Sequence, residues 1–414
     1  MKSFYNRILD YTTDQKFILL TAIAMFMPFY IGIGVLIVDM FYFVYQNKFK
    51  EIFDKTNLSV FGLIFAVYSL VVSIVFNNTY GILATVGMFV LFVFVLFIRK
   101  NMTEQFMEDC MIIIMLFASF CFLITLTQYS IILKNNSFNY AQFMKYISEN
   151  RTTVGTFFFN ANYYAMVCSL VGIISAYKYF STESFERLFS LVVGVLSVLT
   201  LLITDSRGAM FASFISVFAL TIMMKKRKYT IAIISLFVLA FVGIVAAGRM
   251  DLIPRIDKIG FDMGLRKSIW ISAIEAFKKN FVIGVGPLGI HNIYATIRNR
   301  AILHSHNLYL DILVNFGLIG AGLLVPIICQ LFKEIKSLYS KKYTKMIVAM
   351  IIMVMIHSMV DVTIFWTQTS FIFLTFVVGV GELSTVPVTE LSLFKNKKSF
   401  NTKIFTKNKT KTSR

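Results

Sequence analysis

The chain has 414 residues, of which 57% are hydrophobic and 16% aromatic, and its mean hydropathy is +0.75. This composition excludes an ordinary soluble globular protein, because soluble domains carry fewer apolar residues. The formal charge of +19 comes from basic residues spread over many short loops. That pattern suits the positive-inside rule and anionic lipid, and it argues against a nucleic-acid partner.

Apolar stretches recur from end to end and predict an all-α, polytopic transmembrane helical bundle of about twelve spans. In chain order the predicted spans are about 17–29, 31–46, 58–76, 80–98, 111–131, 160–177, 188–204, 209–224, 229–247, 307–332, 345–365 and 368–385. The first two are short and are divided at Pro28, so one long kinked helix is the alternative to two spans. No small-residue cleavage site is evident, which favours a first span over a removed signal peptide.

Lysine and arginine are concentrated in alternate loops, and this bias predicts that both termini are cytoplasmic. Four regions follow: an N-terminal transmembrane bundle of about nine spans (1–247), a large extracytoplasmic loop (248–306), three C-terminal transmembrane helices (307–385) and a basic, disordered cytoplasmic tail (386–414). The four cysteines lie in or beside apolar stretches without CxxC spacing, so we expect neither a disulfide nor a metal site. They are Cys110, Cys121, Cys168 and Cys329.

Two polar strings precede the large loop on the predicted outer side. Arg151, Asn160 and Asn162 lead into the sixth span, where such residues either anchor the helix at the interface or contact sugars. Arg207 lies in the turn Thr204-Asp205-Ser206-Arg207-Gly208. An arginine at this boundary is costly to bury unless it pairs, here with Asp205, or faces a polar cavity.

The large loop contains a predicted amphipathic helix from Arg266 to Phe281. Trp270 and four further residues share its apolar face: Ala273, Ile274, Phe277 and Phe281. Arg266 is four residues before Trp270 and lies on the same side. It either snorkels at the interface or is held over a substrate cleft. Next comes Gly284-Val-Gly286-Pro287, which is a helix stop or a place of close backbone approach.

Histidines close the loop in the string His304-Ser305-His306-Asn307, which opens the apolar run from Leu308. Histidine is the side chain most easily poised to move a proton near neutral pH, although a polar helix start is the alternative interpretation. Asn307 and Asp311 are spaced i,i+4 and share a face. Gly317 and Gly320 farther along predict tight helix packing.

A last ionisable pair, His357 and Asp361, is spaced i,i+4 near the predicted outer end of the eleventh span. Intramembrane pairs of this kind either mark a functional site or serve structure alone.

These strings lie on one predicted side of the membrane and offer three arginines, histidine and asparagine amides. Arginine forks match pyrophosphate oxygens, and a neutral histidine can take a proton from a sugar hydroxyl. We find no carboxylate cluster suited to Mg²⁺ and no Cys/His set suited to zinc. The residues therefore predict metal-free group transfer from a lipid pyrophosphate donor, with no cofactor.

The arrangement resembles the bacterial O-antigen polymerase and ligase family over roughly residues 150–365. The resemblance rests on the Arg-x3-Trp stretch, the Gly-Val-Gly turn, the His-Asn-x-Tyr-Leu-x-Asp order with Gly-x-x-Gly after it, and two upstream matches. In this chain they are Arg266-Lys-Ser-Ile-Trp270, Gly284-Val-Gly286-Pro287, the string His306 to Asp311, Gly317-Leu-Ile-Gly320, Gly155-Thr-Phe with Asn160-Ala-Asn162, and Ser206-Arg207-Gly208.

The resemblance implies transfer of glycan repeat units from an undecaprenyl-pyrophosphate carrier at the outer leaflet of the bacterial inner membrane. By motif position, the catalytic candidates are Arg207, Arg266 and His306, and His304 is an extra histidine whose role the family pattern does not fix. The substrate-binding candidates are Arg151, Asn160, Asn162, Trp270, His304, Asn307, Asp311, His357 and Asp361.

We expect a polymerase of capsule, exopolysaccharide or O-antigen type, with membrane lipids, a flippase and a chain-length regulator as partners. A ligase that passes the finished glycan to a separate acceptor shares the same motifs. A lipid-linked oligosaccharide flippase and a scaffold of an export complex are the alternatives from other classes. A flippase needs a path to both sides of the membrane, whereas the functional-looking residues gather on one side.

Overall fold

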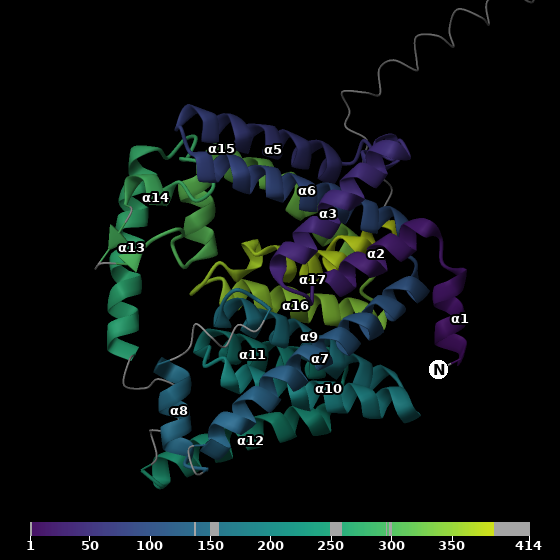
Figure 1. The fold of residues 1–414 in the computed structure, drawn as a ribbon, viewed down its shortest axis with the longest axis vertical. Helices are drawn as coiled ribbons and strands as arrows, with labels where there is room; N and C mark the ends of the chain where they lie inside the picture. The colour runs from purple at the N-terminus through teal and green to yellow at the C-terminus, as the bar shows by residue number, and fades with distance from the viewer. Residues whose placement is uncertain are drawn as a thin grey trace, which may run out of the picture.

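The computed structural model describes residues 2–135, 138–149, 157–248, 259–294, 296–297 and 300–384, and these residues are almost entirely helical (Figure 1). The all-α prediction is confirmed, and each of the twelve predicted spans corresponds to a helix. The elements are α1 (Lys2–Asp10), α2 (Thr13–Ala24), α3 (Phe29–Tyr45), α4 (Phe49–Ile52), α5 (Asn57–Val75), α6 (Thr79–Asn101), α7 (Glu104–Asn135), α8 (Tyr140–Glu149), α9 (Ala161–Ser181), α10 (Ser184–Ile203), α11 (Arg207–Met223), α12 (Arg227–Ala246), α13 (Ile259–Lys279), α14 (Ile290–Ile293), β1 (Thr296–Ile297), β2 (Arg300–Ala301), α15 (Leu308–Ser337), α16 (Lys342–His357), η4 (Thr363–Phe365), α17 (Thr367–Val377) and η5 (Gly379–Leu383). Strands β1 and β2 form one short antiparallel pair.

Several helices are long and apolar enough to cross a membrane, so the chain is a multi-pass membrane protein. Among the described residues, five helices meet the length and composition of a span: α5, α6, α7, α10 and α15. Three shorter apolar segments accompany them, namely α3, α11 and Thr367–Leu383. The count of about twelve spans is not confirmed, because a helix such as α2, with 12 residues, rises only about 18 Å and a hydrocarbon core is about 30 Å thick.

The chain turns sharply at Pro28, which ends any continuous helix there. Helix α2 stops at Ala24 and α3 starts at Phe29, directly after Pro28, so two helices form and the single kinked helix is wrong. Inside this pair Asp39 is buried, and the Thr21 hydroxyl donates to its Oδ2 at 2.7 Å. The contact satisfies one of the two carboxylate oxygens, and Oδ1 of Asp39 has no hydrogen-bond partner among the described residues.

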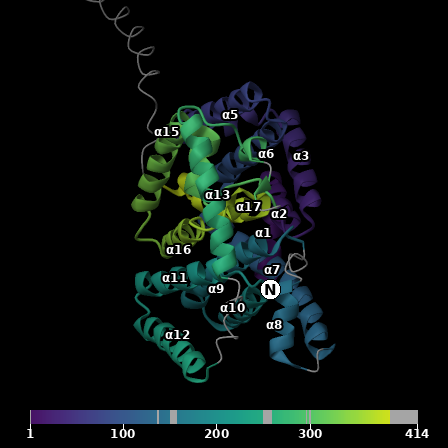
Figure 2. The ribbon, with the colours of Figure 1, turned by 90° about the vertical axis from the view of Figure 1, so that its left-hand side faces the viewer.

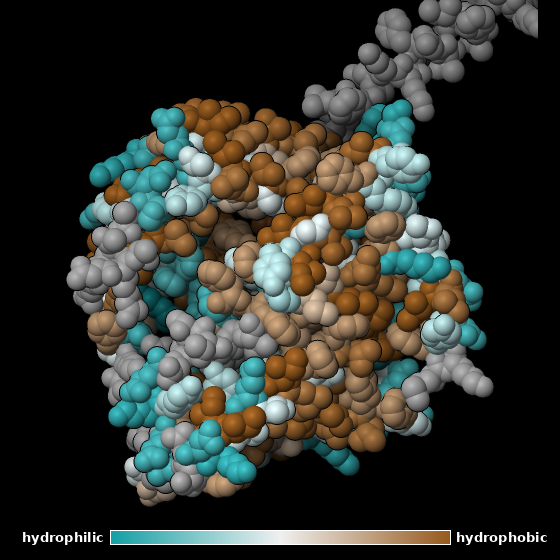
Figure 3. Space-filling model, viewed as in Figure 1, coloured by the Kyte–Doolittle hydropathy of each residue, from teal (hydrophilic) through white to brown (hydrophobic). Residues whose placement is uncertain are grey.

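Helix α13 lies across one end of the bundle, whereas most of the long helices run toward that end. Figure 1 shows it upright beside the ends of the other helices, and Figure 2 shows it passing in front of α16, α9 and α11. Hydrophobic residues cover the middle of the face drawn in Figure 3, and hydrophilic ones gather at the end of α13 and at the opposite end. The distribution fits a bundle whose middle lies in lipid.

The face by which α13 packs differs from the predicted one. Ile269, Ala273 and Ala276 are buried against Val285 and its neighbours. Of the predicted apolar face, Ala273 is buried, whereas Ile274 is 43% exposed and Phe281 is 51% exposed. Helix α13 runs from Ile259 to Lys279, so the predicted bounds 266–281 start too late and Phe281 lies beyond the helix end.

Helix α15 is broken at Gly317, and the loop after α13 fills the break. Gly317 has φ +61° and ψ −168°, a conformation that essentially only glycine adopts. Directly after it, the backbone amides of Leu318 and Ile319 donate to the carbonyls of Phe281 and Val282, at 2.9 and 3.1 Å. The amide of Gly286 donates to the Asn315 carbonyl at 2.8 Å. The backbone groups freed by the break are thus paired within the protein.

The Gly284–Gly286 turn is therefore a place of close backbone approach, in addition to a helix stop. A Cβ on Gly284 would lie 2.4 Å from the Asn315 carbonyl oxygen, and one on Gly317 would lie 2.4 Å from the Val282 carbonyl oxygen. Asn78, directly before α6, also binds this loop, because its side-chain amide donates to the Pro287 carbonyl at 2.8 Å. These contacts fix the end of α13 against the first half of α15.

Candidate functional site

A polar cavity of about 160 Å³ lies where α13 crosses the bundle. Six side chains predicted as site residues line it, and they come from five segments that are far apart in the chain. They are Asn162 of α9, Arg207 of α11, Arg266 of α13, His306 before α15, and His357 and Asp361 at and after the end of α16. The fold thus brings together all three residues predicted as catalytic.

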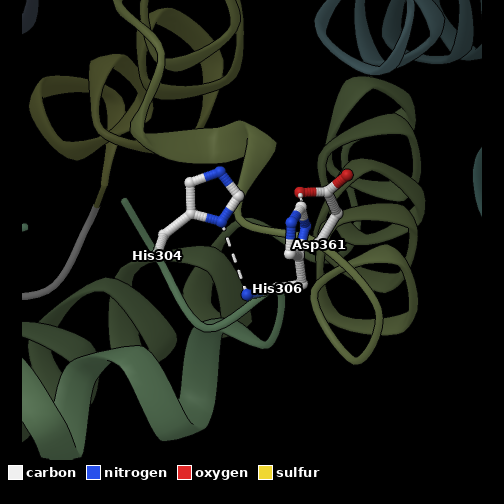
Figure 4. A group of neighbouring side chains, drawn as sticks. All are labelled: His304, His306 and Asp361. Carbon is white, nitrogen blue, oxygen red and sulfur yellow. Dashed lines mark hydrogen bonds and ion pairs between the residues drawn. The ribbon is translucent and has the colours of Figure 1, made fainter. Parts of the chain in front are cut away.

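His306 and Asp361 form the pair at the centre of the site. The Nδ1 atom of His306 lies 3.3 Å from Oδ1 of Asp361, and the side chains are 35% and 4% exposed. Figure 4 shows the His306 ring directed at the Asp361 carboxylate, with the two residues on different loops. The backbone of His306 has φ +53°, in the left-handed region that is uncommon for residues other than glycine. Strained backbone of this kind is concentrated at functional sites.

Asp361 is held from several directions. The Val362 amide donates to its Oδ1 at 2.8 Å, and the Asn162 side-chain amide donates to its Oδ2. The Ser206 hydroxyl in turn donates to Oδ1 of Asn162 at 3.0 Å. Burial acts to raise the pKa of Asp361, but the hydrogen bond to His306 and the nearby imidazoles outweigh it and hold that pKa below its ordinary value.

The ionised carboxylate decides which nitrogen of His306 carries the proton. A carboxylate only accepts hydrogen bonds, so the neutral ring donates from Nδ1 and keeps an unprotonated Nε2. Because His306 also lines the cavity, that Nε2 is the atom of the pair that can accept a proton from a bound molecule. The arrangement is a base with an orienting carboxylate.

His304 lies behind His306 and does not line the cavity. The two ring centroids are 4.3 Å apart with an edge-to-face geometry, and the His306 backbone amide donates to Nδ1 of His304 at 3.4 Å (Figure 4). Burial, followed by the neighbouring His306, lowers the pKa of His304 to about 4. His304 is thus a neutral neighbour near pH 7, and of the two histidines only His306 lines the cavity among the described residues.

Acidification is expected to destabilise the protein through His304. The folded protein holds its pKa at about 4, below the ordinary value of 6.5, so the unfolded chain binds the proton first as pH falls. Stability is therefore full above pH 6.5 and declines as pH drops toward 4. We expect the thermal unfolding temperature of detergent-solubilised protein to fall over this range, and to fall less in His304→Gln. Equal slopes for the two proteins would contradict this assignment.

Arg207 is the first residue of α11 and reaches across to α13. Its Nη2 lies 2.8 Å from Oδ2 of Asp262, with side-chain exposures of 27% and 16%. Arg266 lies one helical turn after Asp262 and lines the same cavity. Two guanidinium groups thus face one small polar space, beside the His306–Asp361 pair. A fixed pair of this kind suits an anion with several oxygens, such as a pyrophosphate.

Three predicted binding residues support the site from outside the cavity lining. Asn160 caps α9, where its Oδ1 accepts from the amides of Asn162 and Tyr163 at 2.9 and 3.1 Å. Asn307 caps α15 by accepting from the Leu310 amide at 3.0 Å. Asp311 is buried and accepts from the Ser305 amide at 2.7 Å, which shapes the loop that carries His306.

Two further predicted residues are not brought to the cavity by the described structure. Trp270 lies on α13 outside the lining, and its indole N–H is buried without a hydrogen-bond partner among the described residues. Arg151 lies outside the described residues, as does the basic tail 386–414.

His357 and Asp361 are not on one helix, although both fall within the predicted span 345–365. Helix α16 ends at His357, and Asp361 follows in a turn, but both line the cavity. Met359, Val360 and Val362 keep the segment partly apolar, so the helix end is not evident from the sequence.

Sequence reasoning missed Asp262, which pairs with Arg207, and gave Ser206 no role of its own. Asp262 is spaced i,i+4 from Arg266 and thus lies on the same side of the helix. This spacing could have indicated that Asp262 belongs to the same site as Arg266. Ser206 was visible only as the neighbour of Arg207.

One group of described residues has the donor types of a metal site. His304, His306 and Asp361 each place one donor atom within 4.8 Å of the other two. Nδ1 of His306 is engaged with Asp361, Nδ1 of His304 with the His306 backbone amide, and the Asp361 carboxylate also with Asn162 and Val362. The expectation of a site without metal stays a prediction.

Comparison with known proteins adds to this geometry. No curated protein matches the chain. A family described as O-antigen ligase matches residues 192–325, about a third of the 414-residue chain. The matched stretch contains Arg207, Arg266 and His306, the three residues that the motif comparison picked out as catalytic. Over residues 192–325, this chain is therefore similar to the O-antigen ligase family.

Proposed function

We propose that the protein is a polysaccharide polymerase that transfers glycan repeat units from an undecaprenyl-pyrophosphate carrier to the end of another lipid-linked repeat. The observation that carries the proposal is the meeting of Arg207, Arg266 and the His306–Asp361 pair in one cavity. The family match supports glycan transfer of this general kind. We place the cavity at the outer leaflet of the bacterial inner membrane, with both termini in the cytoplasm, because that orientation agrees with the charge bias of the loops.

The residues suit a direct displacement. An acceptor sugar hydroxyl attacks the anomeric carbon of the donor glycan, and its proton passes to Nε2 of His306. The bond between the anomeric carbon and the pyrophosphate oxygen breaks, and the electron pair leaves with the lipid pyrophosphate. Asp361 orients the imidazole and stabilises the imidazolium that forms. No cofactor enters this scheme.

Arg207 and Arg266 stabilise the charge that develops on the leaving pyrophosphate. A guanidinium keeps its charge at any working pH and offers parallel N–H donors to phosphate oxygens. The two arginines come from different helices, α11 and α13, so they can hold the pyrophosphate from two sides. Stabilisation of developing charge by fixed groups is often the largest contribution to an enzyme's rate.

Ligase chemistry is the second candidate function, and the similarity to a family described as O-antigen ligase favours it. A ligase would use the same cavity and the same His306, but it would pass the glycan to a separate acceptor. The number of transfers per acceptor separates the two functions.

The deciding experiment is reconstitution of the full chain in liposomes with an undecaprenyl-pyrophosphate-linked repeat unit as the sole substrate. We expect a ladder of products by gel electrophoresis. Arg207→Ala should lower the rate of their formation about 10²–10³-fold. Arg187→Ala, whose guanidinium contacts Tyr179 at another part of the bundle, is the matched control and should keep the wild-type rate.

The outcomes of this experiment distinguish the candidates. Product only after a foreign acceptor is added, with one transfer each, would support the ligase and contradict the polymerase. Normal ladders from Arg207→Ala would contradict the role of Arg207. Accumulation of repeats on the inner leaflet of cells that lack the protein would instead support a flippase.

A further inference from the structure

Among the described residues that line the cavity, carboxylates outnumber guanidiniums. Arg207 and Arg266 lie there together with Asp205, Asp262 and Asp361. One of the two guanidiniums is already paired, because Arg207 contacts Asp262 at 2.8 Å. An anion that binds Arg207 must therefore displace this carboxylate or compete with it.

Asp262 is the carboxylate suited to be displaced. Asp361 is fixed by the Val362 amide, Asn162 and His306, and its side chain is 4% exposed. Asp205 is 2% exposed in a turn with φ +53°. The side chain of Asp262 is more accessible, at 16%, and it occupies Arg207, one of the two guanidiniums that would hold the pyrophosphate.

We propose that Asp262 is an internal anion that holds Arg207 before substrate binds and gives it up to the pyrophosphate of the lipid-linked substrate. The inference rests on the proposed function and adds a positioning residue to it. Asp262 keeps the arginine oriented toward the cavity before substrate arrives. After transfer, the same carboxylate competes with the lipid pyrophosphate for Arg207 and so favours product release.

Helix α13 can stay in place during this exchange. Its apolar residues Ile269, Ala273 and Ala276 are buried against the loop and α15, independently of the ion pair. Partly exposed ion pairs contribute little to stability. Loss of the Asp262 charge should thus change anion binding more than folding.

The test is binding of inorganic pyrophosphate to the full-length, detergent-solubilised protein by titration calorimetry. Asp262→Asn removes the competing charge with little change in shape, and we expect it to lower the Kd at least about threefold. Asp262→Ser should change it in the same direction. Glu275→Gln is the matched control, because Glu275 is on the same helix, pairs with Tyr294 outside the cavity and loses the same charge. It should leave the Kd unchanged.

The results separate the proposed exchange at Asp262 from the pyrophosphate site of the proposed function. If Arg207→Ala weakens pyrophosphate binding but Asp262→Asn does not strengthen it, the exchange is wrong and the phosphate site stands. If wild type and Arg207→Ala bind equally weakly, the phosphate site of the proposed function fails, and the exchange fails with it. If Asp262→Asn or Asp262→Ser loses its cooperative unfolding transition, the ion pair is structural and the exchange is wrong.

Discussion

Replacement of His306 by alanine is expected to lower the rate of glycan transfer about 10²–10⁴-fold, the usual contribution of a positioned general base. The expected loss follows from the pair with Asp361, which lies 3.3 Å from the His306 Nδ1 and leaves Nε2 to accept the acceptor's proton. The variant should fold, because the His306 side chain is 35% exposed and the loop is shaped by the contact between Ser305 and Asp311.

His291 offers a matched control for this measurement. It lies in the same long loop, its Nδ1 is 3.0 Å from the Ile302 carbonyl oxygen, and it does not line the cavity. Initial rates of the ladder reaction should therefore be unchanged in His291→Ala and strongly reduced in His306→Ala, at equal amounts of monodisperse protein. Transfer at the wild-type rate without the His306 imidazole would rule out its role as the base.

The helices were predictable because a run of hydrophobic residues indicates a segment buried in lipid or in the protein core, whichever residues it packs against. The twelve apolar segments therefore all appear as helices. Their ends were harder to place, because apolar residues such as Met359, Val360 and Val362 follow the end of α16 at His357. The number of spans also depends on lengths that the pattern gives only approximately, as α2 and α3 show.

The site was predictable as a set of residue types but not as a set of partners. Arginine at an apolar boundary and histidine at a helix start are unusual enough to be noticed one by one. The partners come from distant segments: Asp262 lies 55 residues after Arg207, and Asp361 lies 55 residues after His306. Spacing rules connect residues within one helix only, so they cannot find such pairs.

Replacement of Gly317 by alanine is expected to destabilise the protein by roughly 3 kcal/mol or more, from backbone strain and steric conflict together. At φ +61° and ψ −168° a side chain is strained in any surroundings. The new Cβ would also lie 2.4 Å from the Val282 carbonyl oxygen and 2.6 Å from the Gly284 nitrogen. Both contacts are to backbone, so relief requires that the loop withdraw from the break in α15.

Gly322 is the control for this change, because it lies in the same helix and a Cβ there would meet nothing within 4 Å. Gly322→Ala should be neutral or slightly stabilising, as alanine favours helix over glycine by about 1 kcal/mol. Thermal unfolding of the two detergent-solubilised variants compares them directly. A large loss for Gly317→Ala alone would show that the interlocked glycines hold the end of α13 against α15. Because α13 carries Arg266 and Asp262, the transfer activity of Gly317→Ala should fall together with its unfolding temperature. Equal unfolding temperatures for Gly317→Ala and Gly322→Ala would mean that the break in α15 tolerates a side chain.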